Sequence, residues 1–174
     1  MKIAITDANL LIELTELGLL DLLLQTGAEI HCTIDMIWQL PLTIRERLPV
    51  ENTDLSLFVH TLQGEECLAI YSEGSYEGMT HGEICSLFLA KKIGAHVPWA
   101  NAVAKKQAGD LAVSCHGMLW IVDIIVDSGV LSAERALEIA NKWITIHPLS
   151  KTSKAILQAF QEKVRKWRNV STRN

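Results

Sequence analysis

The order of hydrophobic and polar positions predicts short strands alternating with helices along the whole chain. A β-rich run at residues 2–6 precedes a leucine-rich stretch at 10–25 with the period of one or two helices. A break near Thr15 and a stop at Gly27 separate this stretch from a second predicted strand at 29–33. The alternation continues with helices predicted at 34–40, 65–73, 101–108, 118–127, 132–142 and 150–167, strands at 55–62, 96–99, 111–115 and 144–147, and helix or loop at 42–49.

The central predicted helix carries the strongest local signals. Thr80 is a good N-cap, and Glu83 follows at the spacing of a capping box. Gly94 stands where a helix ends, and the next strand contains Pro98, which cannot donate a ladder hydrogen bond and so favours an edge or a strand end. Two roles stay open for Glu83. It caps the helix, or it points into a site at the strand ends and holds a cation.

This alternation predicts an α/β protein, with a mostly parallel sheet covered on both faces in a three-layer α/β/α arrangement. We expect one domain over residues 1–147, and a basic amphipathic helix and tail at 148–174 that packs on the same domain. Ligands of an open parallel sheet collect beyond the carboxyl ends of its strands. The polar residues expected near those ends are Asp7, Gln39, Glu83 and Asn101.

Composition and charge narrow the function classes. Hydrophobic residues make up 49% of the 174 positions, as in an ordinary globular protein. No apolar run reaches the roughly 18 residues of a membrane span, and Asp7 and Glu13 interrupt the first apolar segment, so we expect a cytoplasmic protein without a membrane partner. The tail at 151–174 holds seven basic residues against Glu162 alone, which indicates either a solvated helix face or a surface for phosphate or an acidic partner.

The cysteines give no recognisable metal motif. They form no Cys-x-x-Cys pair and have no histidine partner at zinc-finger spacing, so we interpret them as small buried thiols. The four are Cys32, Cys67, Cys85 and Cys115.

Several segments, in their order along the chain, resemble the characteristic sequence segments of a PIN-like domain. They are 6–12, 38–40, 78–83 with 90–95, and 113–119. The resemblance covers roughly residues 1–147 and implies a homodimeric, metal-dependent ribonuclease, a class that includes toxins of toxin–antitoxin pairs. Such domains gather four acids: one after the first strand, one in the second helix, one at the start of the central helix and one after the following strand. Together these acids hold Mg²⁺ or Mn²⁺, which activates water against a phosphodiester.

The chain departs from that pattern at two of the four positions. Asp7 and Glu83 match as catalytic and metal-binding acids, but Gln39 replaces the acid of the second helix, and the fourth position falls at Ala100 or Asn101. An amide oxygen can ligate a metal, yet it carries no charge and cannot act as a base. The resemblance therefore leaves catalysis open, and we expect weak binding of Mg²⁺ or Mn²⁺, if any, and a nuclease activity that is weakened or lost.

Other residues are candidates to rebuild the site or to contact a substrate. Asp35 lies one helical turn before Gln39 and is a candidate metal ligand, as are Asp110 and Glu13. Nitrogen ligands would favour a softer metal, and the candidate histidines are His81, His96 and His116, of which His81 and His116 stand beside glycines near the predicted cleft. The residues expected to bind substrate are Asn9, Gln39, Asn101 and Lys105.

Three hypotheses of function follow. In the first, a PIN-like protein with a decayed nuclease site binds single-stranded RNA or a protein partner. In the second, an active Mg²⁺- or Mn²⁺-dependent ribonuclease of toxin type pairs with an antitoxin-like partner. In the third, the protein is purely an interaction module, and the apolar stripe of the last helix packs on a partner rather than on its own domain. RNA held by basic residues of the tail would be released as salt rises, whereas an apolar interface would not. Those residues are Lys163, Arg165, Lys166 and Arg168.

Overall fold

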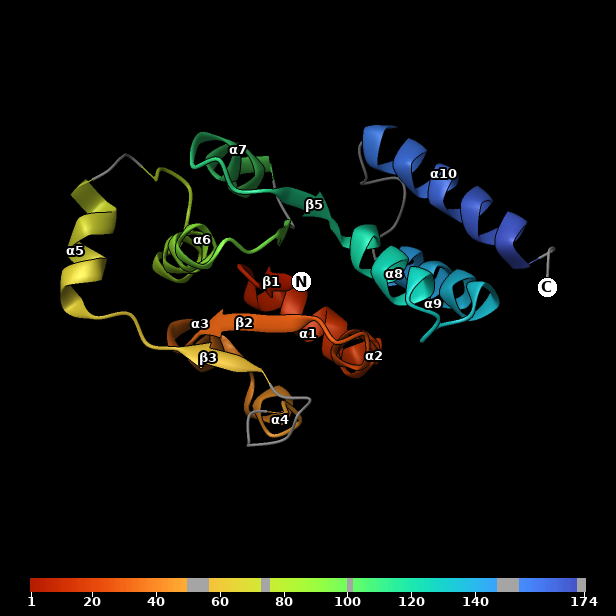
Figure 1. Cartoon of the computed structure of the whole chain (residues 1–174), viewed down its shortest axis with the longest axis horizontal. Helices are drawn as coiled ribbons and strands as arrows, with labels where there is room; N and C mark the ends of the chain where they lie inside the picture. The colour runs from red at the N-terminus through yellow and green to blue at the C-terminus, as the bar shows by residue number, and fades with distance from the viewer. Residues whose placement is uncertain (50–56, 73–75, 100–101, 147–153, 172–174) are drawn as a thin grey trace. The chain divides into compact units, whose positions relative to one another are not determined.

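The computed structural model describes residues 1–49, 57–72, 76–99, 102–146 and 154–171 (Figure 1). The chain divides into two compact units, Met1–Met118 and Leu119–Asn174, each considered by itself below. The strands, all in the first unit, are β1 (Lys2–Ala4), β2 (Glu29–Thr33), β3 (Phe58–His60), β4 (Val97–Trp99) and β5 (Cys115–Gly117). The helices of the first unit are α1 (Ala8–Glu16), α2 (Leu19–Gln25), α3 (Ile34–Gln39), α4 (Leu42–Arg45), α5 (Gly64–Ser72), α6 (His81–Ile93) and α7 (Ala102–Asp110). The second unit holds α8 (Met118–Asp127), α9 (Ala133–Ile146) and α10 (Lys154–Ser171).

The strand pairs described in the first unit are all parallel, which confirms the expected α/β class with parallel sheets. One sheet has the order β1-β2-β3, and β4 pairs with β5 in another. A bridge between Ile3 and His96 joins the two sheets. At this bridge Ala4 N–H donates to His96 O at 2.8 Å, and His96 N–H donates to Lys2 O at 2.9 Å. The strands therefore follow one another as β3-β2-β1-β4-β5, and their carboxyl ends share one edge.

Pro98 is the middle residue of β4, and β4 lies between β5 and the bridge to β1 rather than at an edge. Of the two alternatives predicted for Pro98, the edge strand is therefore wrong, and the end of a strand pairing holds on the β1 side. Val97 N–H donates to Ser114 O at 2.8 Å on the β5 side. Successive amides of a strand alternate between its two sides, so the nitrogen of Pro98 faces the β1 side, just beyond the Ile3–His96 bridge. The bridge is the last described pair there, which is why proline is tolerated.

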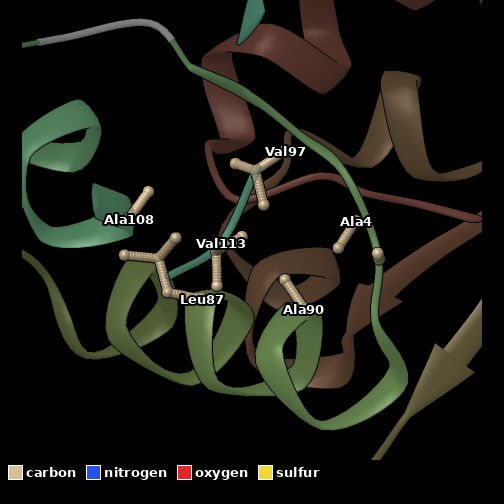
Figure 2. Close-up of a cluster of buried hydrophobic side chains, with 7 residues drawn as sticks. Ala4, Leu87, Ala90, Val97, Ala108 and Val113 are labelled. Atoms are coloured by element: carbon tan, nitrogen blue, oxygen red, sulfur yellow. The ribbon is translucent and has the colours of Figure 1, made fainter. Parts of the chain in front are cut away.

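Helix α6 begins and ends where the sequence predicts. Thr80 caps it in a full capping box with Glu83, and Gly94 closes it in the left-handed conformation with φ of 65°. Figure 2 shows how α6 packs on the sheet: Leu87 and Ala90 lie against buried side chains from the strands and from the region of α7. These are Ala4, Ala95, Val97, Ala108 and Val113.

Both faces of β1 are covered. Ala4 packs with the α6 cluster, and Ile3, which strand alternation places on the opposite face, is also 0% exposed. Leucines of α1 and α2 supply a large part of the buried core of this unit, as the leucine-rich stretch at 10–25 predicts. The helix break expected near Thr15 falls at Leu17 and Gly18, where Gly18 has φ of 68°.

Two predicted strands are not strands. In the range predicted as a strand at 111–115, Val113 N–H donates to Ala108 O at 2.8 Å, and Ala112 has a positive φ of 57°, so this segment closes α7 and β5 begins only at Cys115. Its hydrophobic residues pack against α6 rather than forming a ladder. The range predicted as extended at 144–147 continues α9 as far as Ile146, and His147 lies outside the described residues.

Two pairs of histidines cross-link neighbouring parallel strands in the first unit. His31 Nδ1 lies 2.9 Å from His60 Nε2, between β2 and β3. His96 Nδ1 lies 3.1 Å from His116 Nε2, between the start of β4 and β5. Burial, followed by the paired imidazole, lowers the pKa of His31 and His116, and burial also lowers the pKa of His60. His31, His60 and His116 therefore resist protonation in the folded protein.

In the second unit, α10 packs against α9, and its charges meet those of α8. Trp167 is 0% exposed and its indole N–H donates to Asp123 Oδ1 at 2.9 Å. Lys163 also pairs with Asp123, and Lys166 lies 3.1 Å from Asp127. The tail helix thus packs within its own unit through Trp167, and two of its lysines are neutralised there.

The unit boundary at Met118 and Leu119 differs from the sequence-based division at 147 and 148, because α8 and α9 group with α10. Among the described residues, no helix combines the length and the apolar character that a membrane crossing requires.

We expect Asp123→Ala to lower the free energy of unfolding by about 2 kcal/mol, because the buried indole N–H of Trp167 loses its acceptor and Lys163 its partner. Asp127→Ala is the matched control, since its ion pair is exposed and it stands at the C-terminal end of α8; we expect a change within about 0.5 kcal/mol. Urea unfolding followed by circular dichroism measures both. Equal losses in the two variants would contradict a structural role for the Asp123–Trp167 contact.

We expect the free energy of unfolding to fall as the pH is lowered from about 7 to about 5. The unfolded chain titrates its histidines near pH 6.5, whereas the lowered pKa values of the folded state oppose proton uptake, so stability is retained above that pH and lost below it. The double variant His60→Gln/His116→Gln removes one imidazole from each pair and should show a smaller fall. Urea midpoints at the two pH values test this, and an equal fall in both proteins would count against the pairs as the cause.

Candidate functional site

A pocket of about 180 Å³ lies at the shared carboxyl edge of β1 and β2. Its walls come from the turn after β1, from α3 and from the N-terminal turn of α6. The lining residues are Thr6, Asp7, Ala8, Asn9, Met36, Gln39, Thr80, Gly82 and Glu83. Segments far apart in the sequence therefore meet where a parallel sheet usually receives its ligand.

Asp7 follows β1 and begins α1. Its backbone is extended, with φ of −133°, and its Oδ1 accepts a hydrogen bond from Asn9 N–H at 2.8 Å. This is an N-cap, the structural role that an acid before a helix often has. Asp7 is half-buried and also lines the pocket, so one carboxylate serves the helix end and the pocket together.

Glu83 combines the same two roles on α6. Its Oε2 accepts from Thr80 N–H at 2.7 Å and from the Thr80 hydroxyl at 3.0 Å, while Glu83 N–H donates to Thr80 Oγ1 at 3.3 Å. Glu83 therefore completes the capping box and also lines the pocket, whereas its role as a cation ligand stays a prediction. A cation in the pocket would share this carboxylate with the backbone of Thr80.

The side chain of Gln39 lies against Gly82, and both residues line the pocket. A methyl group added at Gly82 would lie only 2.3 Å from Gln39 Nε2, so the absence of a side chain at Gly82 makes room for the amide. Gln39 is exposed at the C-terminal end of α3, and Met36, one turn earlier, is buried behind it. The amide thus stands where the resemblance expects an acid, and it adds hydrogen-bonding capacity but no charge.

The structure brings together four of the sequence-predicted site residues, namely Asp7, Asn9, Gln39 and Glu83. Asn101 lies outside the described residues. Lys105 is exposed on α7, and it does not line the pocket. The proposed replacement acids do not line the pocket either; these are Asp35, Glu13 and Asp110.

Sequence reasoning missed Thr6, Met36, Thr80 and Gly82 as pocket residues. Thr6 and Met36 had a usable signal, since one precedes Asp7 directly and the other precedes Gln39 by one helical turn. Thr80 was noted as a cap and Gly82 only as part of the glycine-rich segment. Neither the capping pattern at Thr80 nor the glycine-rich segment around Gly82 predicts that the amide of Gln39 packs against Gly82.

The three histidines considered as metal ligands for the pocket do not line it. His96 pairs with His116 as described above. His81 belongs to the first turn of α6, and its Nδ1 lies 2.5 Å from the hydroxyl of Tyr71 on α5. Its Nε2 lies 3.4 Å from the Sγ of Cys85, one turn further along α6. Cys67 of α5 completes a cluster in which the ligand atoms of Cys67, His81 and Cys85 all lie within 4.8 Å of one another.

This cluster was not predicted, because the cysteines were interpreted as unconnected buried thiols. Cys32 and Cys85 are buried, as expected, whereas Cys67 and Cys115 are only partly buried. Burial, with a smaller contribution from Cys67, raises the pKa of the Cys85 thiol to about 12. The spacing of His81 and Cys85, four residues apart on one helix, is the signal that sequence reasoning could have used.

Comparisons of the chain with protein-family models, with curated proteins and with solved structures found no match. The interpretation of the pocket therefore depends on its geometry and on the resemblance described above.

We expect the substitutions Gly82→Ala and Gln39→Ala to be coupled by about 0.5–1 kcal/mol in the free energy of unfolding. Alanine at position 82 improves helix propensity but displaces the Gln39 amide, so its benefit should emerge fully only when Gln39 is also alanine. Urea unfolding of the wild type, the two single variants and the double variant measures the coupling. Gly64→Ala is the control, because a methyl group there meets nothing within 4 Å. If the changes in the free energy of unfolding of the two single variants simply add up in the double variant, the Gln39 amide does not pack against Gly82.

Proposed function

We propose that this chain is a PIN-like domain that binds single-stranded RNA without cleaving it. The observation that carries the proposal is the pocket at the carboxyl edge of the parallel strands, where Asp7 and Glu83 stand with Gln39 in place of a third acid. A three-layer PIN-like arrangement is supported by the strand succession β3-β2-β1-β4-β5 and by the burial of both Ile3 and Ala4 on opposite faces of β1.

The charge of the pocket favours binding over hydrolysis. Two carboxylates line it, and each already accepts backbone hydrogen bonds at a helix N-terminus. Mg²⁺ prefers several oxygen ligands in a near-ideal octahedron, and metal-assisted hydrolysis requires the ion to be held firmly beside the attacking water. The amides of Asn9 and Gln39 can offer oxygens to such an ion but no negative charge. These residues fit a weakly held, largely hydrated ion, and no hydrolytic step is assigned to them.

An amide at Gln39 in place of a third acid also reduces the electrostatic repulsion between the pocket and RNA. Each carboxylate replaced by an amide removes one repulsion of a phosphate group and adds an N–H donor. Asn9 and Gln39 are exposed and line the pocket, so their amides can reach a phosphate or a base edge.

Helix α7 supplies nearby positive charge. A methyl group added at Gly78, just before α6, would meet the Val103 side chain at 3.8 Å, so the first turn of α7 borders the segment that leads into the pocket. Lys105 and Lys106 are exposed on this helix. We assign the phosphate contacts to α7, because its exposed lysines belong to the same compact unit as the pocket.

The test uses a fluorescently labelled single-stranded RNA and the full chain. We expect binding by anisotropy at low salt, undiminished by EDTA, and intact RNA after prolonged incubation with Mn²⁺. Lys105→Ala/Lys106→Ala should weaken binding and reduce the slope of log affinity against log salt by about 1.4, because two phosphate contacts are lost. Lys142→Ala is the control, since this exposed lysine of α9 lies in the other unit.

Two results would contradict the proposal. Mn²⁺-dependent cleavage that is abolished by Asp7→Asn would mean that the pocket is catalytic. Absence of RNA binding at low salt would leave only a protein-binding role for the domain.

A further inference from the structure

A second site lies on another side of α6, away from the acidic pocket. Cys67 comes from α5, and His81 and Cys85 come from the first two turns of α6, four residues apart and therefore on one face of the helix. The two Sγ atoms and one imidazole nitrogen of His81 all lie within 4.8 Å of one another. These three side chains thus converge on one point although the first is separated from the others by the chain between α5 and α6.

The distances resemble those of a tetrahedral metal site. Cys85 Sγ lies 3.4 Å from His81 Nε2. Zinc bonds of about 2.3 Å to sulfur and about 2.0–2.1 Å to nitrogen, at tetrahedral angles, place such a pair about 3.6 Å apart, and two sulfurs about 3.8 Å apart. The Cys85–His81 separation needs a change of only about 0.2 Å, and the separations to Cys67, all within 4.8 Å, need at most about 1 Å to reach coordination geometry.

Tyr71 holds the imidazole in a suitable orientation. Its hydroxyl lies 2.5 Å from His81 Nδ1, and the two rings stack with an interplanar angle of 8°. When Nδ1–H donates to the Tyr71 oxygen, Nε2 keeps its lone pair and faces Cys85. A partner on the non-coordinating nitrogen is the usual outer support of a metal-bound histidine.

We propose that Cys67, His81 and Cys85 bind one thiolate-preferring divalent cation, zinc foremost, with Tyr71 as the positioning residue. Two soft sulfur ligands and one imidazole select zinc over Mg²⁺ or Mn²⁺, which prefer oxygen. Binding replaces the two thiol protons, which pass to solvent, and leaves two thiolates and a neutral imidazole on the ion. Three protein ligands leave the fourth tetrahedral position to water or to a donor atom of a bound molecule.

A bound ion would attach α5 to α6, and the sparse packing of α5 indicates why this attachment is needed. Among the described residues of α5, only Ile70 is buried, packing with Ile84 and Cys85 of α6. Leu68 and Tyr71 are 75% and 51% exposed. A helix with so little buried surface is weakly held, and a metal bond from Cys67 to α6 would fix it in place. This inference does not depend on RNA binding by the acidic pocket.

The experiment uses the reduced full chain, kept in a non-chelating phosphine reductant, and Zn²⁺ or Co²⁺ as the probe. After gel filtration, elemental analysis should find one equivalent of zinc per chain. Co²⁺ should give thiolate-to-metal charge-transfer absorption together with visible bands of a tetrahedral ion. Hydrogen exchange should show that added Zn²⁺ protects the amides of α5.

Variants assign the ligands. We expect Cys67→Ser and Cys85→Ser each to weaken Zn²⁺ binding more than a hundredfold and, at saturating Co²⁺, to lower the thiolate charge-transfer absorption to that of a single sulfur ligand. Tyr71→Phe keeps the stacking but loses the hydroxyl, and it should weaken binding about 10–100-fold without changing the number of sulfur ligands. Cys115→Ser is the matched control for a partly buried thiol outside the cluster, and Asp7→Asn is the control for the acidic pocket; both should leave Zn²⁺ affinity unchanged.

Each outcome decides the proposal. If Cys85→Ser fails to fold, His81→Ala replaces an exposed side chain and still tests it, with a loss of affinity of tenfold or more expected. Zinc retained equally by Cys67→Ser or His81→Ala would overturn the assignment. A reduced chain that retains no zinc would also overturn it, and a Cys67–Cys85 disulfide in the oxidised form of that chain would then assign the pair to redox chemistry.

Discussion

The capping box at the start of α6 is the interaction on which the candidate sites depend. Thr80 and Glu83 satisfy each other's backbone amides and fix where the helix begins. Because the first turn is fixed, Gly82 and Glu83 face the acidic pocket while His81 faces α5. The same helix packs Leu87 on the sheet, so the position of both sites is set by one helix end and one buried cluster.

The elements that the sequence predicts well are those with strong local chemistry. Thr80, Glu83 and Gly94 mark the ends of α6, and the run at 29–33 becomes β2 with the same bounds. These signals act through hydrogen bonds and backbone preferences within a few residues, so no long-range information is needed. The grouping of Asp7 with Glu83 also follows from the sequence, because parallel strands place their carboxyl ends at one edge.

The features that could not be predicted from the sequence depend on contacts between segments that are distant along the chain. Val113 has the β-branched character of a strand residue, yet it is buried against the α6 cluster while its backbone closes α7. The histidine pairs depend on which strands are neighbours, and the meeting of Cys67 with His81 depends on how α5 folds back on α6. The fit of Gln39 against Gly82 is equally a matter of tertiary packing, and no spacing rule within one segment reveals it.

The short backbone pairing between β1 and β4 affects how the five strands can separate. Among the described residues, two backbone hydrogen bonds beside the Ile3–His96 bridge join the two sheets, whereas each sheet has its own ladder. Partial opening of a protein follows its least connected boundary. Backbone pairing is therefore weakest between β1 and β4. If backbone hydrogen bonds alone held the strands, β4 and β5 could separate from β1 as a pair while the hydrogen bonds within each sheet stayed formed. The cluster around Leu87 and Ala90 opposes that separation, so side-chain packing rather than backbone pairing makes the five strands act as one sheet.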